Sequence, residues 1–191
     1  TAGSYSSHIQ GTVADDFPSL PTITKGKTIT LSTDLLKSSL DKTMLAASSD
    51  ETRPILGGLY FHSADGELFI AATDGYRLAE AKITDIKDDI AAVVPAAALQ
   101  DALRIIQDSN DEEIDLRFDE GQFGVTSNGT QLVSRLIDGQ YPAYRQLIPE
   151  SSEIQFQIKR SDFLTAAKLA SLVARESGGS ITLKASELDK T

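Results

Sequence analysis

One short segment, AATDGYRLA from Ala71 to Ala79, holds the side chains best suited to binding chemistry. Its pattern predicts a strand, a turn around Gly75 and a second strand. A threonine, an aromatic, an arginine and a leucine meet at this bend. Such a turn presents an apolar surface with a fixed cation beside it, while Thr73 and Gly75 leave room for a ligand. This combination suits the capture of a short peptide.

A peptide pocket on this turn needs a floor and a wall. Leu56 and Leu78 are expected to form the apolar floor, and Arg77 a wall that stacks on the ligand or hydrogen-bonds to it. Pro142, which stiffens its segment, and Leu147 extend the floor. Burying an aromatic or leucine anchor there stabilises a complex by about 2 kcal/mol or more. The structural alternative is a tight glycine turn in which Arg77 only forms an ion pair.

The chain shows no signature of catalysis, metal binding or cofactor binding. It has no Cys, no G-x-S-x-G elbow, no phosphate-binding loop and no dinucleotide fingerprint. Its two histidines, His8 and His62, lie far apart on expected strands. The acidic run 108–113 has Glu113 where an EF-hand calcium loop needs glycine. A hydrolase using Asp74 would need a second convergent carboxylate, so we predict no catalytic residue, no metal and no cofactor.

The charge balance argues against tight binding to nucleic acid. The 191 residues carry a formal net charge of -10, whereas non-specific DNA binding relies on a basic surface that releases counterions. An acidic protein can still encircle DNA, because a topological tether requires no affinity. No apolar run approaches the length of about 20 residues that crosses a bilayer. We therefore expect no membrane contact and a cytoplasmic location, with which the lack of cysteine is compatible.

The elements expected to position the turn occur twice in the same order. Each half begins with a strand, continues with an amphipathic helix and ends with three strands, and the halves are offset by roughly 55 to 60 positions. The first half has expected strands at 28–31, 59–62, 68–72 and 76–83, and a helical stripe of Leu36, Leu40, Met44 and Ala47. The second has expected strands at 90–94, 114–118, 122–126 and 130–136, and a stripe of Leu99, Leu103 and Ile106.

Turn and cap residues support this assignment. Asp65-Gly66 and Asn128-Gly129 are typical of two-residue hairpins. Ser32 or Thr33 is expected to cap the first helix, and Pro95 to occupy the first turn of the second. The predicted fold class is α+β: two strand-helix-three-strand halves lie side by side, with helices packed on antiparallel sheets so that both stripes are buried.

The complete domain is expected at residues 22–149, with partial domains on either side. Residues 1–21 are interpreted as the end of a preceding domain plus a linker, with a possible terminal strand at 4–13. Residues 150–191 begin the same pattern a third time. The expected elements there are strands at 154–158 and 181–183 and a helix from about Ser161.

Several segments together resemble one family, the bacterial DNA polymerase III beta subunit or sliding clamp. The segments that resemble its second domain are DETRPIL at 50–56, AATDGYRLA at 71–79, VVP at 93–95 and LIDGQYPAY at 136–144. DFPSLP at 16–21 resembles the end of its first domain. Each piece is weak alone, but the combination in this order is specific. The chain is therefore similar to a central-domain fragment of such a clamp.

The resemblance implies a function without catalysis. Members of the family have three such domains per protomer and close head to tail into a homodimeric ring that slides on duplex DNA. The ring tethers the replicative polymerase, and a shared pocket takes short linear motifs of the DNA polymerase III alpha subunit, the clamp loader, and ligase and repair proteins. A central-domain fragment is expected neither to close a ring nor to hold a polymerase on DNA by itself.

The resemblance also implies site residues. The implied peptide-binding set is Leu56, Thr73, Gly75, Tyr76, Arg77, Leu78, Pro142 and Leu147. Tyr76 stands where many members have His, which changes the pocket edge. The expected DNA-facing cations are Arg53 on a loop and Lys37, Lys42 and Arg104 on the helices. Acidic neighbours offset the helical cations, so only loose, salt-sensitive contact with DNA is expected. The competing interpretation is a freestanding α+β module of the peptide-binding or adhesin-like kind.

Overall fold

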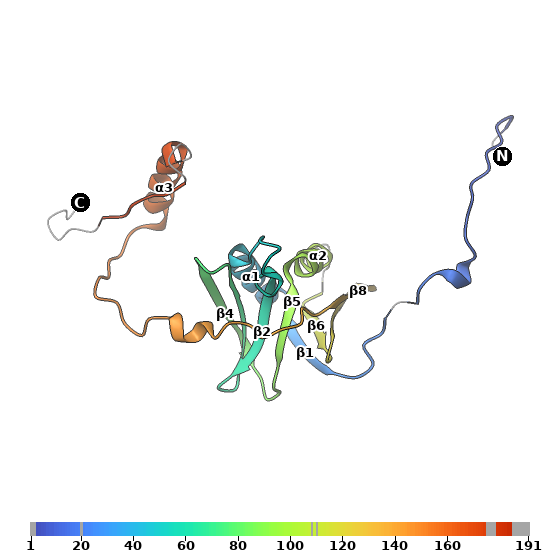
Figure 1. The fold of residues 1–191 in the computed structure, drawn as a ribbon, viewed down its shortest axis with the longest axis horizontal. Coiled ribbons are helices and arrows are strands. Elements are labelled where there is room, and N and C mark those ends of the chain that lie inside the picture. The colour runs from blue at the N-terminus through green and yellow to red at the C-terminus, as the bar shows by residue number, and fades with distance from the viewer. Residues whose placement is uncertain (1–2, 20, 108, 110, 175–178, 185–191) are drawn as a thin grey trace. The chain divides into compact units, whose positions relative to one another are not determined.

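The computed structural model describes residues 3–19, 21–107, 109, 111–174 and 179–184. By its internal contacts the chain divides into two compact units, residues 1–142 and 143–191. The first unit contains eight strands and two α-helices among its described residues. Figure 1 traces both units along the chain.

The first unit follows the predicted order of elements twice. Its first repeat comprises β1 (Lys27–Ser32), α1 (Thr33–Thr43), β2 (Gly58–Ala64), β3 (Glu67–Thr73) and β4 (Leu78–Asp85). Its second repeat comprises β5 (Ala91–Pro95), α2 (Ala96–Gln107), β6 (Glu113–Phe118), β7 (Gln122–Ser127) and β8 (Thr130–Arg135). Short 3-10 turns lie at η1 (Ala14–Asp16), η2 (Met44–Ala46) and η3 (Pro54–Gly57). The predicted α+β class is confirmed.

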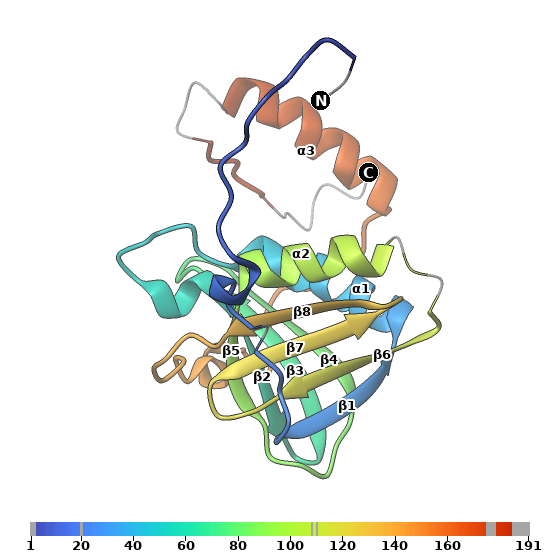
Figure 2. The ribbon, with the colours of Figure 1, turned by 90° about the vertical axis from the view of Figure 1, so that its right-hand side faces the viewer.

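The two antiparallel sheets do not follow the two repeats strand for strand. One sheet has the order β4-β3-β2-β5 and the other the order β1-β6-β7-β8, as Figure 2 shows for the second. Thus β5 of the second repeat pairs with β2, and β1 of the first repeat pairs with β6. Each repeat gives its first strand to the sheet of the other, which joins the repeats into one folding unit. The repeat of elements in the sequence did not predict this exchange.

The core lies between the helices and the sheets and between the sheets themselves. Figure 1 shows α1 and α2 next to each other over the sheets. The helical stripe residues Leu36, Leu40, Leu99 and Ile106 are buried. Between the sheets, the ring centroid of Phe61 on β2 lies 5.4 Å from that of Phe118 and 6.1 Å from that of Phe123. The second predicted stripe is therefore buried, as is the part of the first that lies on α1. Met44 and Ala47, predicted to continue the first stripe, lie beyond the end of α1 and are partly buried.

The two expected hairpins are present. Asp65 and Gly66 have φ angles of 53° and 79°, and Asn128 and Gly129 have φ angles of 45° and 74°. Positive φ at both central residues is the requirement of a type I′ turn, whose twist matches that of the flanking strands. These turns fix the register of β2 with β3 and of β7 with β8.

The structure corrects three local expectations at element ends. Ser32 occupies the N-cap position of α1 as expected, but its side chain makes no cap hydrogen bond. The Thr33 hydroxyl instead donates to the Asp111 carbonyl at 2.6 Å. Pro95 ends β5 rather than entering the helix. The strand expected from Tyr76 begins at Leu78, because the residues before it form a hydrogen-bonded turn.

The flanking segments form no strands where these were expected. Residues 6–13, 154–158 and 181–183 lie outside regular strands. In the second of these segments Ile154, Phe156 and Ile158 are exposed. Alternating apolar residues form a stable strand only beside a partner strand, and among the described residues no strand of either sheet pairs with this segment.

The second unit contains η4 (Tyr144–Leu147) and α3 (Arg160–Ala174). The helix confirms the one expected from about Ser161. Leu169, Leu172 and Val173 on this helix are exposed. In neither unit does a described helix have the length and apolarity needed to cross a membrane.

Candidate peptide-binding site

The turn between β3 and β4 is held by hydrogen bonds from two side chains. The Thr73 hydroxyl accepts the Gly75 N–H at 3.1 Å and donates to the Arg77 carbonyl at 2.7 Å. Asp74 Oδ1 accepts the N–H groups of Tyr76 and Arg77 at 2.9 and 3.0 Å. Gly75 has a φ of 92°, which side chains rarely allow. The turn therefore has a single well-defined shape, which makes it a rigid platform.

Arg77 is both paired and accessible. Its Nε lies 2.9 Å from Asp74 Oδ2, so the ion pair of the structural alternative is present. Even so, 61% of the Arg77 side chain is exposed to solvent. The pair fixes the base of the guanidinium and leaves its outer face available for stacking or for further hydrogen bonds. An ion pair and a binding role are thus compatible at this residue.

Arg53 contacts the same turn, although the sequence suggested a DNA-facing loop. Its Nη2 donates to the Asp74 carbonyl at 3.3 Å, and its Nε pairs with Asp50 Oδ2 at 3.1 Å. The Asp50 carboxylate also accepts the N–H and the hydroxyl of Thr52. These bonds lower the pKa of Asp50, with Thr52 the largest cause. The Asp50–Arg53 ion pair and the hydrogen bond from Arg53 to the Asp74 carbonyl therefore link the 50–53 loop to the turn.

Tyr141 joins the turn to the segment that carries Pro142. The Thr73 N–H donates to the Tyr141 hydroxyl at 3.0 Å. The Tyr141 ring is 7% exposed and stacks on Tyr60, with centroids 4.9 Å apart. The sequence did not lead us to include Tyr141 in the site. The available signal was an aromatic directly before a proline in a segment already assigned to the pocket.

The remaining predicted residues differ in how far they reach solvent. Leu56, within η3, is only 6% exposed, and Leu78 is partly buried. Tyr76 is 96% exposed at the tip of the turn, and Pro142 is exposed. Leu147 belongs to the second unit, where it is 73% exposed. The first unit thus brings together the predicted residues of the turn with Arg53, while Leu147 lies outside that unit.

The Asp74 carboxylate makes the shape of the turn depend on pH only in acid. Its pKa lies below the ordinary value of 3.8, chiefly because the Arg77 and Tyr76 amides donate to it. A lowered folded-state pKa means that the stabilisation is complete above 3.8 and is lost as the pH falls through the lower folded value. We expect the NMR shifts of the Tyr76 and Arg77 amides to stay constant from neutral pH until that acid range. Asp74→Asn should abolish the transition, and a midpoint above 3.8 would contradict the assignment.

The predicted helical cations lie on α1 and α2. Lys37 is partly buried and Lys42 is exposed on α1. Arg104 on α2 pairs with Asp101 at 2.8 Å. This pair offsets one of the three charges, as the sequence led us to expect. Among the described residues there is no group of three or more histidines and carboxylates able to hold a metal ion.

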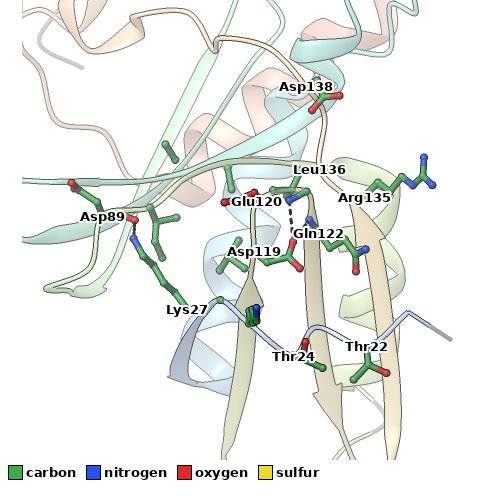
Figure 3. Close-up of a pocket in the computed structure, with 17 residues that line it drawn as sticks. Thr22, Thr24, Lys27, Asp89, Asp119, Glu120, Gln122, Arg135, Leu136 and Asp138 are labelled. Carbon is green, nitrogen blue, oxygen red and sulfur yellow. Dashed lines mark hydrogen bonds between the residues drawn. The ribbon is translucent and has the colours of Figure 1, made fainter.

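A separate groove of about 1090 Å³ opens beside the start of β1, the start of β5 and the β6–β7 turn. Figure 3 shows its labelled side chains. The Lys27 ammonium donates to the Asp89 carbonyl. The Asp119 carboxylate accepts the Gly121 and Gln122 N–H groups. None of the predicted peptide-binding residues is among the described residues that line it, so the turn and the groove are different surfaces.

Comparison with known proteins identifies the family to which the first unit is similar. The family model for the DNA polymerase III beta subunit, central domain, matches residues 30–143. The beta sliding clamp of Staphylococcus epidermidis is 36% identical over 183 residues, which are 95% of this chain and 48% of that protein. The beta sliding clamp of Staphylococcus aureus is 34% identical over the same shares. The chain spans about half the length of these curated relatives.

The solved structures that resemble this chain are also sliding clamps. The DNA polymerase sliding clamp of Bacillus subtilis has a TM-score of 0.76 and 38% identity, covering 85% of this chain and 43% of that one. The DnaN sliding clamp of Bartonella birtlesii, bound to griselimycin, has a TM-score of 0.78 and 28% identity, covering 87% and 46%.

Proposed function

The chain belongs to the DNA polymerase III beta subunit family, and from this membership we propose that it supplies the central part of a DNA sliding clamp. Such a clamp encircles duplex DNA and tethers the replicative polymerase and other replication and repair proteins. The observation that carries the proposal is the match of the central-domain model to residues 30–143. The freestanding-module alternative gains no support, since each relative reported above is a sliding clamp.

We propose further that the whole protein is a non-catalytic, cytoplasmic, head-to-tail homodimeric ring. Of the three domains of such a protein, this chain would contain the end of the first in residues 1–21, the whole of the second in residues 22–149 and the start of the third in residues 150–191. A ring holds DNA by topology rather than affinity, which agrees with the net charge of -10.

Retention on DNA tests the ring. The full-length protein that contains this chain is loaded onto nicked circular DNA by its clamp loader, and bound protein is measured before and after a restriction cut. A topological clamp stays on the circle and leaves once the DNA is linear. Equal retention on both forms would show binding by affinity and would overturn the proposal.

We propose that the turn from Thr73 to Leu78, with Leu56 and Pro142, forms the share of the partner-peptide pocket that the first unit supplies. Three features support it: the rigid turn, the accessible guanidinium of Arg77 and the apolar side chains of Leu56 and Leu78. The expected ligands are short motifs rich in Gln, Leu and Phe in the DNA polymerase III alpha subunit, the clamp loader and other clamp-binding proteins.

Arg77→Ala is expected to weaken binding of a fluorescent Gln-Leu-x-Leu-Phe peptide about threefold to tenfold, the range that a lost hydrogen bond gives. Fluorescence anisotropy measures the affinity. Arg104→Ala is the matched control, because Arg104 is also an exposed arginine paired with an aspartate three residues before it. An equal loss of affinity in both variants would point to a general charge effect instead of a pocket.

We propose that Lys37, Lys42 and Arg104 face the DNA and contact it loosely, whereas Arg53 has a second role at the turn. In the full-length protein, Lys37→Ala with Lys42→Ala should reduce the slope of log affinity against log salt by up to about 2. Lys82→Ala, which removes a cation that pairs with Glu67 on β3, is the control. An unchanged slope in the double variant would remove these lysines from the DNA-facing set.

A further inference from the structure

At Thr73, β3 is still paired with β4 on one side but is no longer paired with β2 on the other. β3 pairs with β2 as far as Ala71 opposite Tyr60, whereas its pairing with β4 continues to Thr73 opposite Leu78. A partly buried N–H at such a position needs another acceptor. The Tyr141 hydroxyl supplies it at 3.0 Å. A side chain from a distant segment thus completes the hydrogen bonding of the strand end.

The position of this hydroxyl is fixed by ring stacking. The Tyr141 ring lies 4.9 Å from Tyr60 with an interplanar angle of 18°, and Tyr60 lies 4.7 Å from His62 at 19°. Tyr60 and His62 belong to β2, in the middle of a sheet. Burial raises the pKa of Tyr141 above 10.0, and the Thr73 amide opposes that rise. The hydroxyl therefore stays neutral near neutral pH and keeps its acceptor role.

We propose that Tyr141 is a positioning residue of the peptide site. Its backbone continues directly into Pro142, and its hydroxyl binds the residue at which the turn begins. It therefore holds Pro142 at a set spacing from Thr73, Arg77 and Leu78, although its own ring is covered. This inference rests on the proposed peptide pocket and adds to it a residue that acts through its neighbours. Preorganised walls reduce the ordering that a peptide must impose when it binds.

Tyr141→Phe tests the proposal, because it keeps the ring and its stacking and removes only the hydroxyl. We expect the 191-residue chain to bind the Gln-Leu-x-Leu-Phe peptide about threefold to tenfold more weakly, as one hydrogen bond predicts. Tyr60→Phe is the matched control. It removes a hydroxyl from the adjacent ring of the same stack, one that makes no hydrogen bond within the described residues. Its affinity should equal that of the unaltered chain.

A second readout separates positioning from a general loss of stability. In Tyr141→Phe the Thr73 amide proton should shift upfield and exchange faster with solvent, while the thermal midpoint should fall by only the few degrees that one lost hydrogen bond gives, so that the chain stays folded during the binding measurement. If the unaltered chain binds the peptide and Tyr141→Phe binds it with the same affinity, this inference alone is overturned. An unchanged Thr73 amide would overturn it as well. No binding to the unaltered chain would overturn the pocket itself, and the inference with it.

Discussion

Phe61→Ala is expected to lower the free energy of unfolding of this chain by about 3–5 kcal/mol, the usual cost of truncating a buried phenylalanine. Phe61 is fully buried, and its ring contacts Phe118 and Phe123 from the opposite sheet. Its removal leaves a cavity between the two sheets, which are each built from strands of both repeats and cannot easily close on it. Urea unfolding followed by circular dichroism measures the change. A loss this large is a substantial share of the about 5–15 kcal/mol typical of a domain.

Tyr76→Ala is the control for this measurement. Tyr76 is also aromatic but is 96% exposed, so its truncation should change the free energy of unfolding by no more than about 0.5 kcal/mol. Similar effects of the two variants would mean that Phe61 does not bridge the sheets.

Gly75→Ala is expected to weaken peptide binding at least about fivefold, since strain at such a position costs about 1–3 kcal/mol. Gly75 has a φ of 92°, and an added Cβ would lie 3.2 Å from Arg53 Nη1. The turn must relax its positive φ, and the end of the Arg53 side chain must shift slightly. A relaxed turn moves Arg77, which is two residues further along it. Anisotropy with the Gln-Leu-x-Leu-Phe peptide measures the effect.

Gly66→Ala separates this effect from loss of stability. Gly66 has a φ of 79° in the β2–β3 hairpin, and an added Cβ would meet nothing within 4 Å. It should therefore cost a similar amount of backbone strain and leave peptide affinity unchanged. Equal weakening in both variants would indicate that strain anywhere in the sheet impairs binding, and that the turn has no special role.

The parts of the fold that depend on nearby residues could be predicted from the sequence. Asp65-Gly66 and Asn128-Gly129 specify hairpins because only certain residues tolerate positive φ. The stripes of Leu36 and Leu99 specify helices by their period. The exchange of first strands was not predicted. No local pattern indicates that β1 pairs with β6, because β6 belongs to the other repeat and lies far from β1 in the sequence.

The site was predictable to the extent that it lies in one turn. The sequence placed Thr73 to Leu78 together because they are consecutive. Arg53 and Tyr141 reach the turn only through the fold, so spacing alone gave Arg53 another expected role and gave Tyr141 none. In the same way, the strand expected at 154–158 had the right alternation of residues and no partner strand in the described part of the chain.

The central claim is that a partner peptide binds at the Thr73–Leu78 turn, and residue-resolved NMR tests it most directly. The ¹⁵N-labelled chain is titrated with the unlabelled Gln-Leu-x-Leu-Phe peptide to millimolar concentration. The account predicts saturable shifts centred on the amides of Leu56, Thr73 to Leu78 and Tyr141, reduced in Arg77→Ala. Shifts centred instead on the groove beside Lys27 and Asp119, or no shifts at all, would contradict it.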